Sequence, residues 1–395
     1  MNNYLENLNE EQKLPVLHKD GPLIVIAGAG SGKTRVLTYR IIHLINEGVD
    51  PFNILALTFT NKAALEMKNR ISLITSESVS RSIWMGTFHS IFARILRSEA
   101  PLIGYPTNFT IYDTYDSEKL ISNIIKEKKL DKDTYKAKSI KNRISSLKNN
   151  FITVENYFNN SELIEVDKAA KRDLFGEIYQ EYVRRCFKAS VMDFDDLLLK
   201  TNELLNKSPE TLLKYQQKFK YILVDEYQDT NYSQYLIVKA LADRHENLCV
   251  VGDDSQSIYS FRGANIDNIL NFKKHYPNSI SYKLEQNYRS TKNIVQAANS
   301  LINHNILKLD KTIWTDNDVG DKIILNKSLS DSDEGRYVSS NIFELKNNFQ
   351  LNNSSFAVLY RTNAQSRSIE DALRRKNIPY QVFGGLSFYQ RKEIK

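Results

Sequence analysis

A run of small residues ending in a lysine and a threonine lies close to the N-terminus. It consists of Ala27, Gly28, Ala29, Gly30, Ser31, Gly32, Lys33 and Thr34. An apolar run precedes it and a helical pattern follows, which is the context of a phosphate-binding loop. Glycines let the backbone turn tightly and aim several N–H groups at one point, where the helix N-terminus adds its positive end. We therefore predict that this loop holds nucleotide phosphates rather than forming a turn that binds nothing.

Three side chains of this loop and its flank carry specific chemistry. The Lys33 ammonium group can reach the β- and γ-phosphates of a nucleotide, and the Thr34 hydroxyl can ligate Mg²⁺. The adjoining Arg35 is a further candidate contact with the nucleotide. Ala27 stands where the usual pattern has its first glycine, and we expect the loop to tolerate this change between small residues.

An acidic pair supplies the second half of the predicted site. Asp225 and Glu226 follow the apolar run Tyr221–Val224, and α/β sheets place their ligands at the carboxyl ends of such strands. We expect Asp225 to hold magnesium and Glu226 to polarise the attacking water. A strand-end acidic pair alone is a weak indication of function. Together with the phosphate loop, it predicts that the chain binds ATP with magnesium and hydrolyses it.

The segments that must position these residues alternate between strand and helix patterns. Hydrophobic periodicity predicts buried strands at 23–27, 54–59, 221–224 and 248–251, and helices at 34–47 and 62–71. Successive strand–helix units imply a parallel sheet. We therefore predict a first α/β domain from residues 1–106 and 190–280.

Residues 107–189 have a different character, and we predict a helical insertion there. Lysine-rich helices are expected at 118–129, 137–149 and 168–188, with no buried strand among them. The insertion would have a basic face, although a charge run is more often simply a solvated surface. Residues 281–385 are expected to form part of a second α/β domain, and 386–395 to begin a further segment. The strands predicted for this second domain are 323–325, 356–360 and 380–383, and its predicted helices are 291–304, 334–347 and 366–375.

Composition is typical of a soluble protein with more than one domain. The 395 residues exceed one ordinary core, and 41% are hydrophobic and 26% charged. The net charge of +7 and a pI near 9.0 favour a polyanionic partner such as nucleic acid. Two cysteines, Cys186 and Cys249, are too few for a disulfide scaffold and are not spaced as a metal site. Without a signal peptide or an apolar run near the ~20 residues of a membrane span, we expect a cytoplasmic protein.

The segment Val224-Asp225-Glu226-Tyr227-Gln228-Asp229-Thr230 resembles motif II of superfamily 1 helicases in their UvrD/Rep branch. Other segments follow in the order of that family's motifs. Residues 8–12 resemble the Q motif, 58–64 motif Ia, 86–90 motif Ib, 251–264 motif III, 284–290 motif IV, and 192–197 the segment after the family's helical insertion. The resemblance covers essentially the whole chain. It implies an α/β, RecA-like P-loop NTPase domain with a helical insertion, followed by a partial second RecA-like domain.

The resemblance also implies roles around the nucleotide. Gln12 would bind the adenine edge, Tyr288 would stack on the adenine, and Gln256 would sense the γ-phosphate. Arg289 matches an arginine finger that stabilises charge on the transferring phosphoryl group; a surface ion pair is the alternative. The predicted catalytic residues are Lys33, Asp225, Glu226, Gln256 and Arg289.

Further matches concern single-stranded DNA. A protein that moves along a strand needs a basic groove and aromatic faces, each stacked base contributing about 1–3 kcal/mol. The aromatic residues that match the family's base contacts are Phe59, Phe194, Tyr259 and Phe261, and the matching motifs add Asn61 and His89 as DNA contacts. A lone aromatic is more often a core residue, but the motif context favours DNA contact here. Relatives usually have Trp at the position of Phe261, so the stack would be smaller. The resemblance implies single-stranded DNA and single–double-strand junctions as partners, and 3′ to 5′ movement.

The chain departs from the family's pattern at residues 388–395, where relatives continue with a second helical insertion and two further motifs. We expect a fragment of a larger enzyme rather than a naturally shortened relative, one that binds ATP but turns it over slowly and unwinds little. Two alternatives remain: a DNA-binding ATP switch without processive unwinding, and a nuclease-coupled recombination subunit. The residues do not distinguish repair from replication, and they identify neither protein partners nor oligomeric state.

Overall fold

The computed structural model describes residues 3–383. It divides into two compact units, one reaching Gly320 and the other beginning at Asp321, and each is described by itself. This boundary lies beyond residue 280, where the sequence places the start of the second domain, because residues 281–320 pack with the first unit. The domain limits expected from the sequence stay predictions. Among the described residues, no helix has the length and apolar character needed to cross a membrane.

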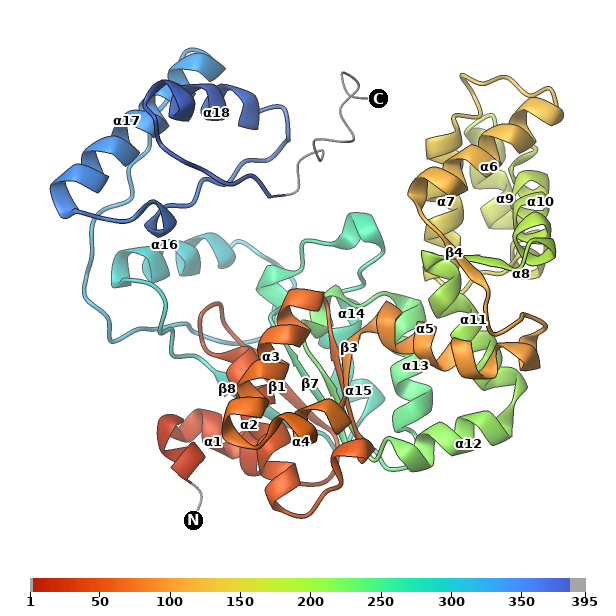
Figure 1. Ribbon diagram of the computed structural model, residues 1–395, viewed down its shortest axis with the longest axis horizontal. Coiled ribbons are helices and arrows are strands. Elements are labelled where there is room, and N and C mark those ends of the chain that lie inside the picture. Colours follow the sequence, from red (N-terminus) through yellow and green to blue (C-terminus); the bar gives the residue numbers. More distant parts are fainter. Residues whose placement is uncertain (1–2, 384–395) are drawn as a thin grey trace. The chain divides into compact units, whose positions relative to one another are not determined.

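A six-stranded parallel sheet forms the centre of the first unit (Figure 1). Its strands, in order across the sheet, are β3 (Trp84–Thr87), β2 (Ile54–Thr58), β6 (Tyr221–Val224), β7 (Leu248–Gly252), β1 (Leu23–Ala27) and β8 (Ile280–Leu284). In β1, Ile24 is in register with Val250 on one side and with Ser281 on the other. Parallel pairing brings the carboxyl ends of all strands to one edge. The predicted α/β fold is confirmed, with β3 and β8 as strands that the sequence analysis did not identify.

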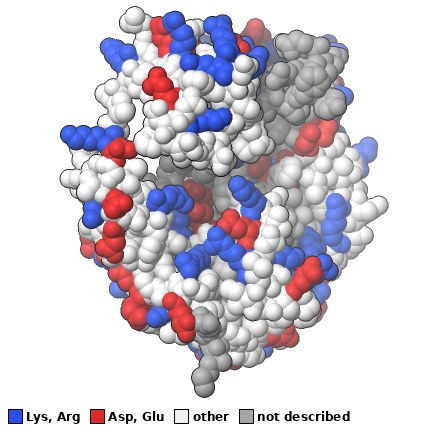
Figure 2. Space-filling view, turned by 60° about the vertical axis from the view of Figure 1, so that its left-hand side comes forward, with Lys and Arg blue, Asp and Glu red and all other residues white. Residues whose placement is uncertain are grey.

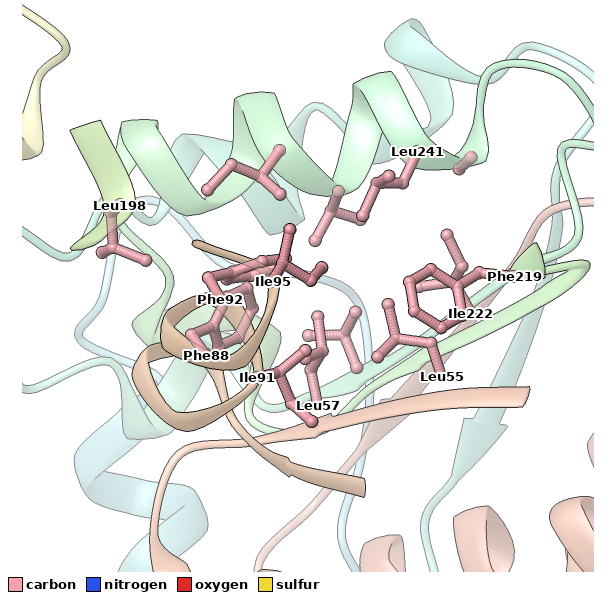
Figure 3. Packing of buried hydrophobic residues seen from close by; sticks show 14 of the residues in the cluster. Leu55, Leu57, Phe88, Ile91, Phe92, Ile95, Leu198, Phe219, Ile222 and Leu241 are labelled. Carbon is pink, nitrogen blue, oxygen red and sulfur yellow. The ribbon is translucent and has the colours of Figure 1, made fainter. Parts of the chain in front are cut away.

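Helices cover both faces of the sheet because residues of each central strand alternate between two cores. Leu55 and Leu57 of β2 point to α5 (Phe88–Glu99), α11 (Phe194–Lys207) and α13 (Tyr232–Ala242), as Figure 3 shows. Ile54 and Ala56 point to the opposite core, with α2 (Lys33–Asn46) and α3 (Asn61–Ile74). Each fully buried leucine or phenylalanine contributes about 1.5–3 kcal/mol. Further helices are α1 (Glu10–Leu17), α4 (Glu77–Ser82), α12 (Pro209–Lys218), α14 (Asp267–Leu270), α15 (Phe272–His275) and α16 (Lys292–Ile302).

The insertion between α5 and α11 is helical, but it differs from the prediction, which did not include the helices at 154–158 and 161–169. Its helices are α6 (Thr114–Glu127), α7 (Ala137–Asn149), α8 (Val154–Phe158), α9 (Ser161–Ala169) and α10 (Phe175–Lys188), packed around a core of their own. The single helix expected at 168–188 is wrong, because Lys171 has a φ of 57° and the chain turns there. A short strand, β4 (Thr110–Tyr112), was also missed; it pairs with β5 (Val191–Asp193), and the pair joins the start and end of the insertion.

A buried lysine fastens this insertion to the rest of the first unit. Lys148, near the end of α7, is fully buried and lies 2.8 Å from Asp193 Oδ2 and 2.9 Å from Asp196 Oδ1. The Tyr182 hydroxyl of α10 donates to the same Asp193 oxygen at 2.8 Å. Burial alone would lower the pKa of Lys148, but the two carboxylates outweigh it and hold the pKa well above its ordinary value. Lys148 therefore stays charged, and α7 is tied to the first turn of α11.

The second unit consists of α17 (Asp331–Phe349) and α18 (Ser366–Arg375) with connecting segments. Ile369, Leu373 and Ile378 form its small core, against which Val338 and Ile342 pack. The helices agree with the prediction, but the strands expected at 323–325, 356–360 and 380–383 do not form in the described residues. A strand exists only as part of a hydrogen-bonded ladder, and none of these segments pairs with another among the described residues.

Candidate active site and nucleic-acid interface

The glycine-rich loop joins β1 to α2 at the carboxyl edge of the sheet. Gly30 and Gly32 have φ of 71° and 91°, a left-handed conformation that glycine adopts without strain. Other segments also lie close to the loop. A Cβ on Gly32 would lie 2.9 Å from Gln12 Nε2, and one on Gly30 would lie 2.8 Å from Arg289 Cβ. The loop thus requires glycine both for its turn and for the close approach of its neighbours.

The acidic pair lies beside this loop, at the end of β6. Glu226 Oε2 is 3.2 Å from Lys33 Nζ, so the loop lysine already has a counter-ion. Glu226 has φ and ψ of 48°, a left-handed conformation that costs a non-glycine residue about 1–2 kcal/mol. Its N–H donates to Asp225 Oδ1 at 3.0 Å, which helps to hold this turn. The structure therefore brings together Lys33, Asp225 and Glu226 as the sequence predicts.

The electrostatics of Asp225 fit a bound cation. Burial, and then the neighbouring Glu226 carboxylate, raise the pKa of Asp225 to about 7, while Lys33 and a hydrogen bond with Thr34 act in the opposite direction. Two carboxylates beside a single lysine leave an excess of negative charge in a buried place. A divalent cation would correct that excess, and carboxylate and hydroxyl oxygens are the ligands that Mg²⁺ prefers. Thr34 and Asp225 are thus suited to hold magnesium.

A buried glutamine links the acidic pair to motif III. Gln228 Nε2 donates to Glu226 Oε2 at 2.9 Å, and Gln228 Oε1 accepts from the N–H of Asp253 at 2.9 Å. Asp253 in turn accepts a hydrogen bond from the side chain of Gln256. Gln256, the predicted γ-phosphate sensor, is therefore connected to Glu226 through two residues, Asp253 and Gln228. Gln228 holds the carboxylate of Glu226 in place, a positioning role that the sequence analysis did not identify.

The predicted adenine side of the site is formed by α1 and motif IV. Gln12 Nε2 donates to the carbonyl oxygen of Ser31 at 2.9 Å, and Gln12 Oε1 accepts from the N–H of Asn9 at 3.3 Å. Asn9 Nδ2 donates to the Tyr288 hydroxyl at 2.6 Å. Gln12 and Tyr288 thus lie on the same side of the loop, but the amide of Gln12 is already engaged. Each end of this amide nevertheless keeps one further site, an N–H on Nε2 and a lone pair on Oε1, with which Gln12 could bind the adenine edge.

A buried arginine holds α1 in this position. The guanidinium group of Arg40 in α2 donates to the carbonyl oxygens of Pro15 at 2.8 Å, of Lys19 at 3.0 Å, and of His18. Burial lowers the pKa of Arg40, although its ordinary value is far above neutrality. The end of α1 is therefore attached to the helix that follows the phosphate loop, and Gln12 is placed with it.

Motif IV crosses the phosphate loop. Asn287 Nδ2 donates to the carbonyl oxygen of Ala29 at 2.6 Å, and the N–H of Tyr288 donates to the carbonyl oxygen of Gly30 at 3.0 Å. Arg289 follows directly and is exposed. Arg35, the other predicted contact, lies over the ring of Tyr39 at 5.7 Å. Motif IV is thus within reach of a nucleotide in the loop, and it is held there by the buried Asn287.

Five of the six predicted DNA contacts gather in a separate groove of about 770 Å³. The ring centroids of Phe59 and Tyr259 are 4.9 Å apart, and those of Tyr259 and Phe261 are 5.9 Å apart. His89 and Phe194 form a second pair, with centroids 5.9 Å apart. Phe194 and Phe261 are 52% and 74% exposed, so these rings are available to stack on bases rather than filling the core. Burial lowers the pKa of His89, which favours its neutral form.

One predicted DNA contact stands apart. Asn61 opens α3 two residues after Phe59 and is exposed, but it does not line the groove. Basic and acidic side chains both line the groove, among them Lys141, Arg262, Asp195 and Asp229, and Lys141 lies 4.0 Å from Asp195. On the face that Figure 2 shows, Lys and Arg are likewise interspersed with Asp and Glu. The groove is therefore distinguished by its exposed aromatic rings rather than by an excess of positive charge.

In comparisons with known proteins, two family models match consecutive parts of the chain. The model of the UvrD/REP helicase N-terminal domain matches residues 8–277, and that of the UvrD-like helicase C-terminal domain matches residues 282–395. The chain belongs to the UvrD/REP helicase family. Curated relatives include the ATP-dependent DNA helicases PcrA of Leuconostoc citreum and of Bacillus subtilis strain 168, each 47% identical to it. These alignments cover 98% and 100% of the chain but 51% and 52% of the relatives, so the chain spans about half their length.

Besides Arg40, three residues of this UvrD/REP chain with buried side chains bear on the site and were not identified from the sequence. They are Gln228, Asn287 and Lys311. Gln228 and Asn287 lie within segments recognised as motifs II and IV. The sequence could have drawn attention to them, because each is a polar residue of a motif to which no role was assigned. Lys311 lies outside every recognised motif, and its ion pairs with motif III depend on tertiary contacts alone.

Proposed function

We propose that this chain binds ATP with magnesium at Lys33 and uses its hydrolysis to move along single-stranded DNA, as the motor portion of an ATP-dependent DNA helicase. One observation carries the proposal. Motif III contains Gln256, which is linked through Asp253 and Gln228 to Glu226, and a few residues later Tyr259 and Phe261 in the aromatic groove. A single short segment thus joins the nucleotide site to the groove.

The ion pair between Lys33 and Glu226 suggests how hydrolysis begins. The two side chains neutralise each other at 3.2 Å. Nucleotide phosphates would compete for the Lys33 ammonium group and release the Glu226 carboxylate, which could then accept a hydrogen bond from the attacking water. Gln228 would keep that carboxylate oriented. Magnesium, held by Thr34 and Asp225, would neutralise phosphate charge, and Arg289 would add positive charge from motif IV.

The finer features of this function also belong to the proposal. Stacking on Phe59, Phe194, Tyr259 and Phe261 ignores base sequence, which suits movement along any strand. Movement from 3′ to 5′, a preference for single–double-strand junctions, a role in repair or replication and a cytoplasmic location follow from the family resemblance. The PcrA relatives, which are ATP-dependent DNA helicases, support the assignment.

The decisive experiment measures ATP hydrolysis with and without oligothymidylate, beside Glu226→Gln and Lys33→Ala variants. We expect stimulation by DNA, a loss of at least about 100-fold in both variants, and retained nucleotide binding only in Glu226→Gln. A folded parent chain that binds no ATP would overturn the proposal. Strand displacement on a tailed duplex then separates a helicase from a DNA-dependent ATP switch, since only the former displaces the strand.

A further inference from the structure

A second buried lysine lies beside motif III. Lys311 belongs to a stretch without helix or strand that follows α16, yet its side chain is only 6% exposed. Its ammonium group is 2.9 Å from Asp253 Oδ1 and also pairs with Asp254 Oδ1. It lies 3.0 Å from Ser255 Oγ as well. The N–H of Leu309 donates to Asp254 Oδ2 at 3.0 Å, so the backbone of the stretch is attached at the same place.

These ion pairs meet the catalytic network at Asp253. That residue accepts from the side chain of Gln256, and its N–H donates to Gln228, which in turn donates to Glu226. Lys311 is thus connected to the carboxylate proposed to activate water through two residues, the side chain and backbone N–H of Asp253 and the side chain of Gln228. Because both carboxylates are buried, loss of the lysine would leave them without a counter-ion. The positions of Asp253 and Gln256 therefore depend on where Lys311 lies.

The same stretch of chain also covers the phosphate loop. A Cβ on Gly28 would lie 2.1 Å from Ile313 Cδ1, so the Ile313 side chain rests directly against that glycine. The next residue, Trp314, accepts at its carbonyl oxygen from the N–H of Asn287 at 2.7 Å. Asn287 in turn bonds to the loop at Ala29. Phosphates entering the loop would meet this stretch, and any shift of Ile313 would be transmitted to Lys311 two residues away.

We propose that Lys311 is a positioning residue that transmits occupancy of the phosphate loop to motif III and hence to the aromatic groove. This inference rests on the proposed function, because it names the residue that joins the two ligand sites. Nucleotide binding moves the stretch that carries Ile313 and Lys311. Lys311 then repositions the carboxylates of Asp253 and Asp254, and with them the segment that contains Tyr259 and Phe261.

The test is thermodynamic coupling between the two ligands, which needs no turnover. The Kd of fluorescent oligothymidylate is measured with and without a non-hydrolysable ATP analogue and magnesium, in the parent chain and in Lys311→Met. We expect the analogue to change the Kd of the parent chain by about fivefold or more. In Lys311→Met, each ligand should still bind alone, but the analogue should change the DNA Kd by less than about twofold.

Two further variants serve as controls. Lys283→Met removes another lysine of the first unit, which forms an exposed ion pair with Asp310 at 3.1 Å. This variant should retain the coupling of the parent chain. Lys311→Arg keeps the positive charge and should retain most of the coupling between the two ligands. If Lys311→Met does not fold, the double variant with Asp254→Asn removes one of the two uncompensated carboxylates and is measured in its place.

The outcomes are distinguishable. Coupling in a folded Lys311→Met chain that equals that of the parent would overturn this inference and leave the proposed function intact. So would an equal loss in Lys283→Met, or a parent chain that binds both ligands without coupling. A folded parent chain that binds neither ligand would overturn the proposed function itself, and the inference with it.

Discussion

Two regions of the first unit use the same chemistry, a buried lysine between two buried carboxylates, in different structural settings. Lys148 belongs to α7, and its partners Asp193 and Asp196 cap and begin α11. Lys311 belongs to a stretch without regular structure, and its partners open motif III. The first cluster joins two helices that have cores of their own, whereas the second joins two connecting segments. Identical charges can therefore act as a rigid attachment in one place and as a movable connection in the other.

The difference lies in what must unfold for the lysine to move. Displacing Lys148 would disturb the end of α7, the capping box of Asp193 and Asp196, and the hydrogen bond from Tyr182. Displacing Lys311 would break its ion pairs with Asp253 and Asp254 and the hydrogen bond from Leu309 N–H, but it would disturb no α-helix, because Lys311 lies in a connecting segment. Elements that move in response to ligands come from parts with few regular hydrogen bonds. The comparison thus predicts that the Lys148 cluster governs stability and the Lys311 cluster governs communication.

The largest expected effect is on the Lys148 cluster. Lys148→Met should lower the free energy of unfolding by about 3–5 kcal/mol, because it leaves two buried carboxylates without their counter-ion. Urea denaturation followed by circular dichroism measures this change. A loss below about 1 kcal/mol would contradict the view of this cluster as the attachment of the insertion.

A smaller effect should depend on pH. Burial and the neighbouring Asp193 carboxylate raise the pKa of Asp196 from 3.8 to about 6. The folded chain therefore binds the Asp196 proton more tightly than the unfolded chain does. The stability gained from this proton is complete below pH 3.8 and is lost as the pH rises through about 6. In Asp196→Asn this contribution is absent. The difference in unfolding free energy between parent and variant should fall by up to about 3 kcal/mol from pH 4 to pH 7, and parallel pH profiles would contradict the assignment.

Within the same cluster, one hydroxyl group should matter less. Tyr182→Phe removes the hydrogen bond to the Asp193 carboxylate and should cost about 1.5–2 kcal/mol, because hydrogen bonds to charged groups are the stronger ones. Tyr179→Phe is the matched control, since its hydroxyl donates at 2.9 Å to the neutral carbonyl oxygen of Ile152. That variant should lose only about 1 kcal/mol. Equal losses in thermal or urea unfolding would show that the charge of Asp193 adds nothing.

The smallest effect is expected where the lysine is exposed. Lys283→Met breaks an ion pair whose partner Asp310 is almost fully exposed, so the free energy of unfolding should change by about 0.5 kcal/mol or less. Lys311→Met, measured alongside, should exceed this value because its partners are buried. If the two variants lose the same stability, burial does not distinguish the Lys311 cluster from a surface ion pair.

The fold was predictable wherever a segment carries its own signal. The strand at Leu23–Ala27 and the helices at Ala137–Asn149 and Ser366–Arg375 have the limits that hydrophobic periodicity predicts. By contrast, β8 was missed although Ile280, Tyr282 and Leu284 alternate with the polar Ser281 and Lys283, a period of two that is typical of a half-buried strand. The segment 356–360 shows the opposite failure. Its apolar pattern resembles a strand, but the described residues offer it no ladder partner.

By itself, the sequence determined the local chemistry of the site. Neighbours along the chain identify these residues. They are glycines that tolerate left-handed angles, a lysine at the start of a helix and acids at the end of a buried strand. Tertiary structure alone decided which side chains compensate one another across long separations, as with Lys148 and Asp193 or Lys311 and Asp253. The physical reason is that a buried charge is stable only beside its partner, and the partner is chosen by packing, which no local pattern records.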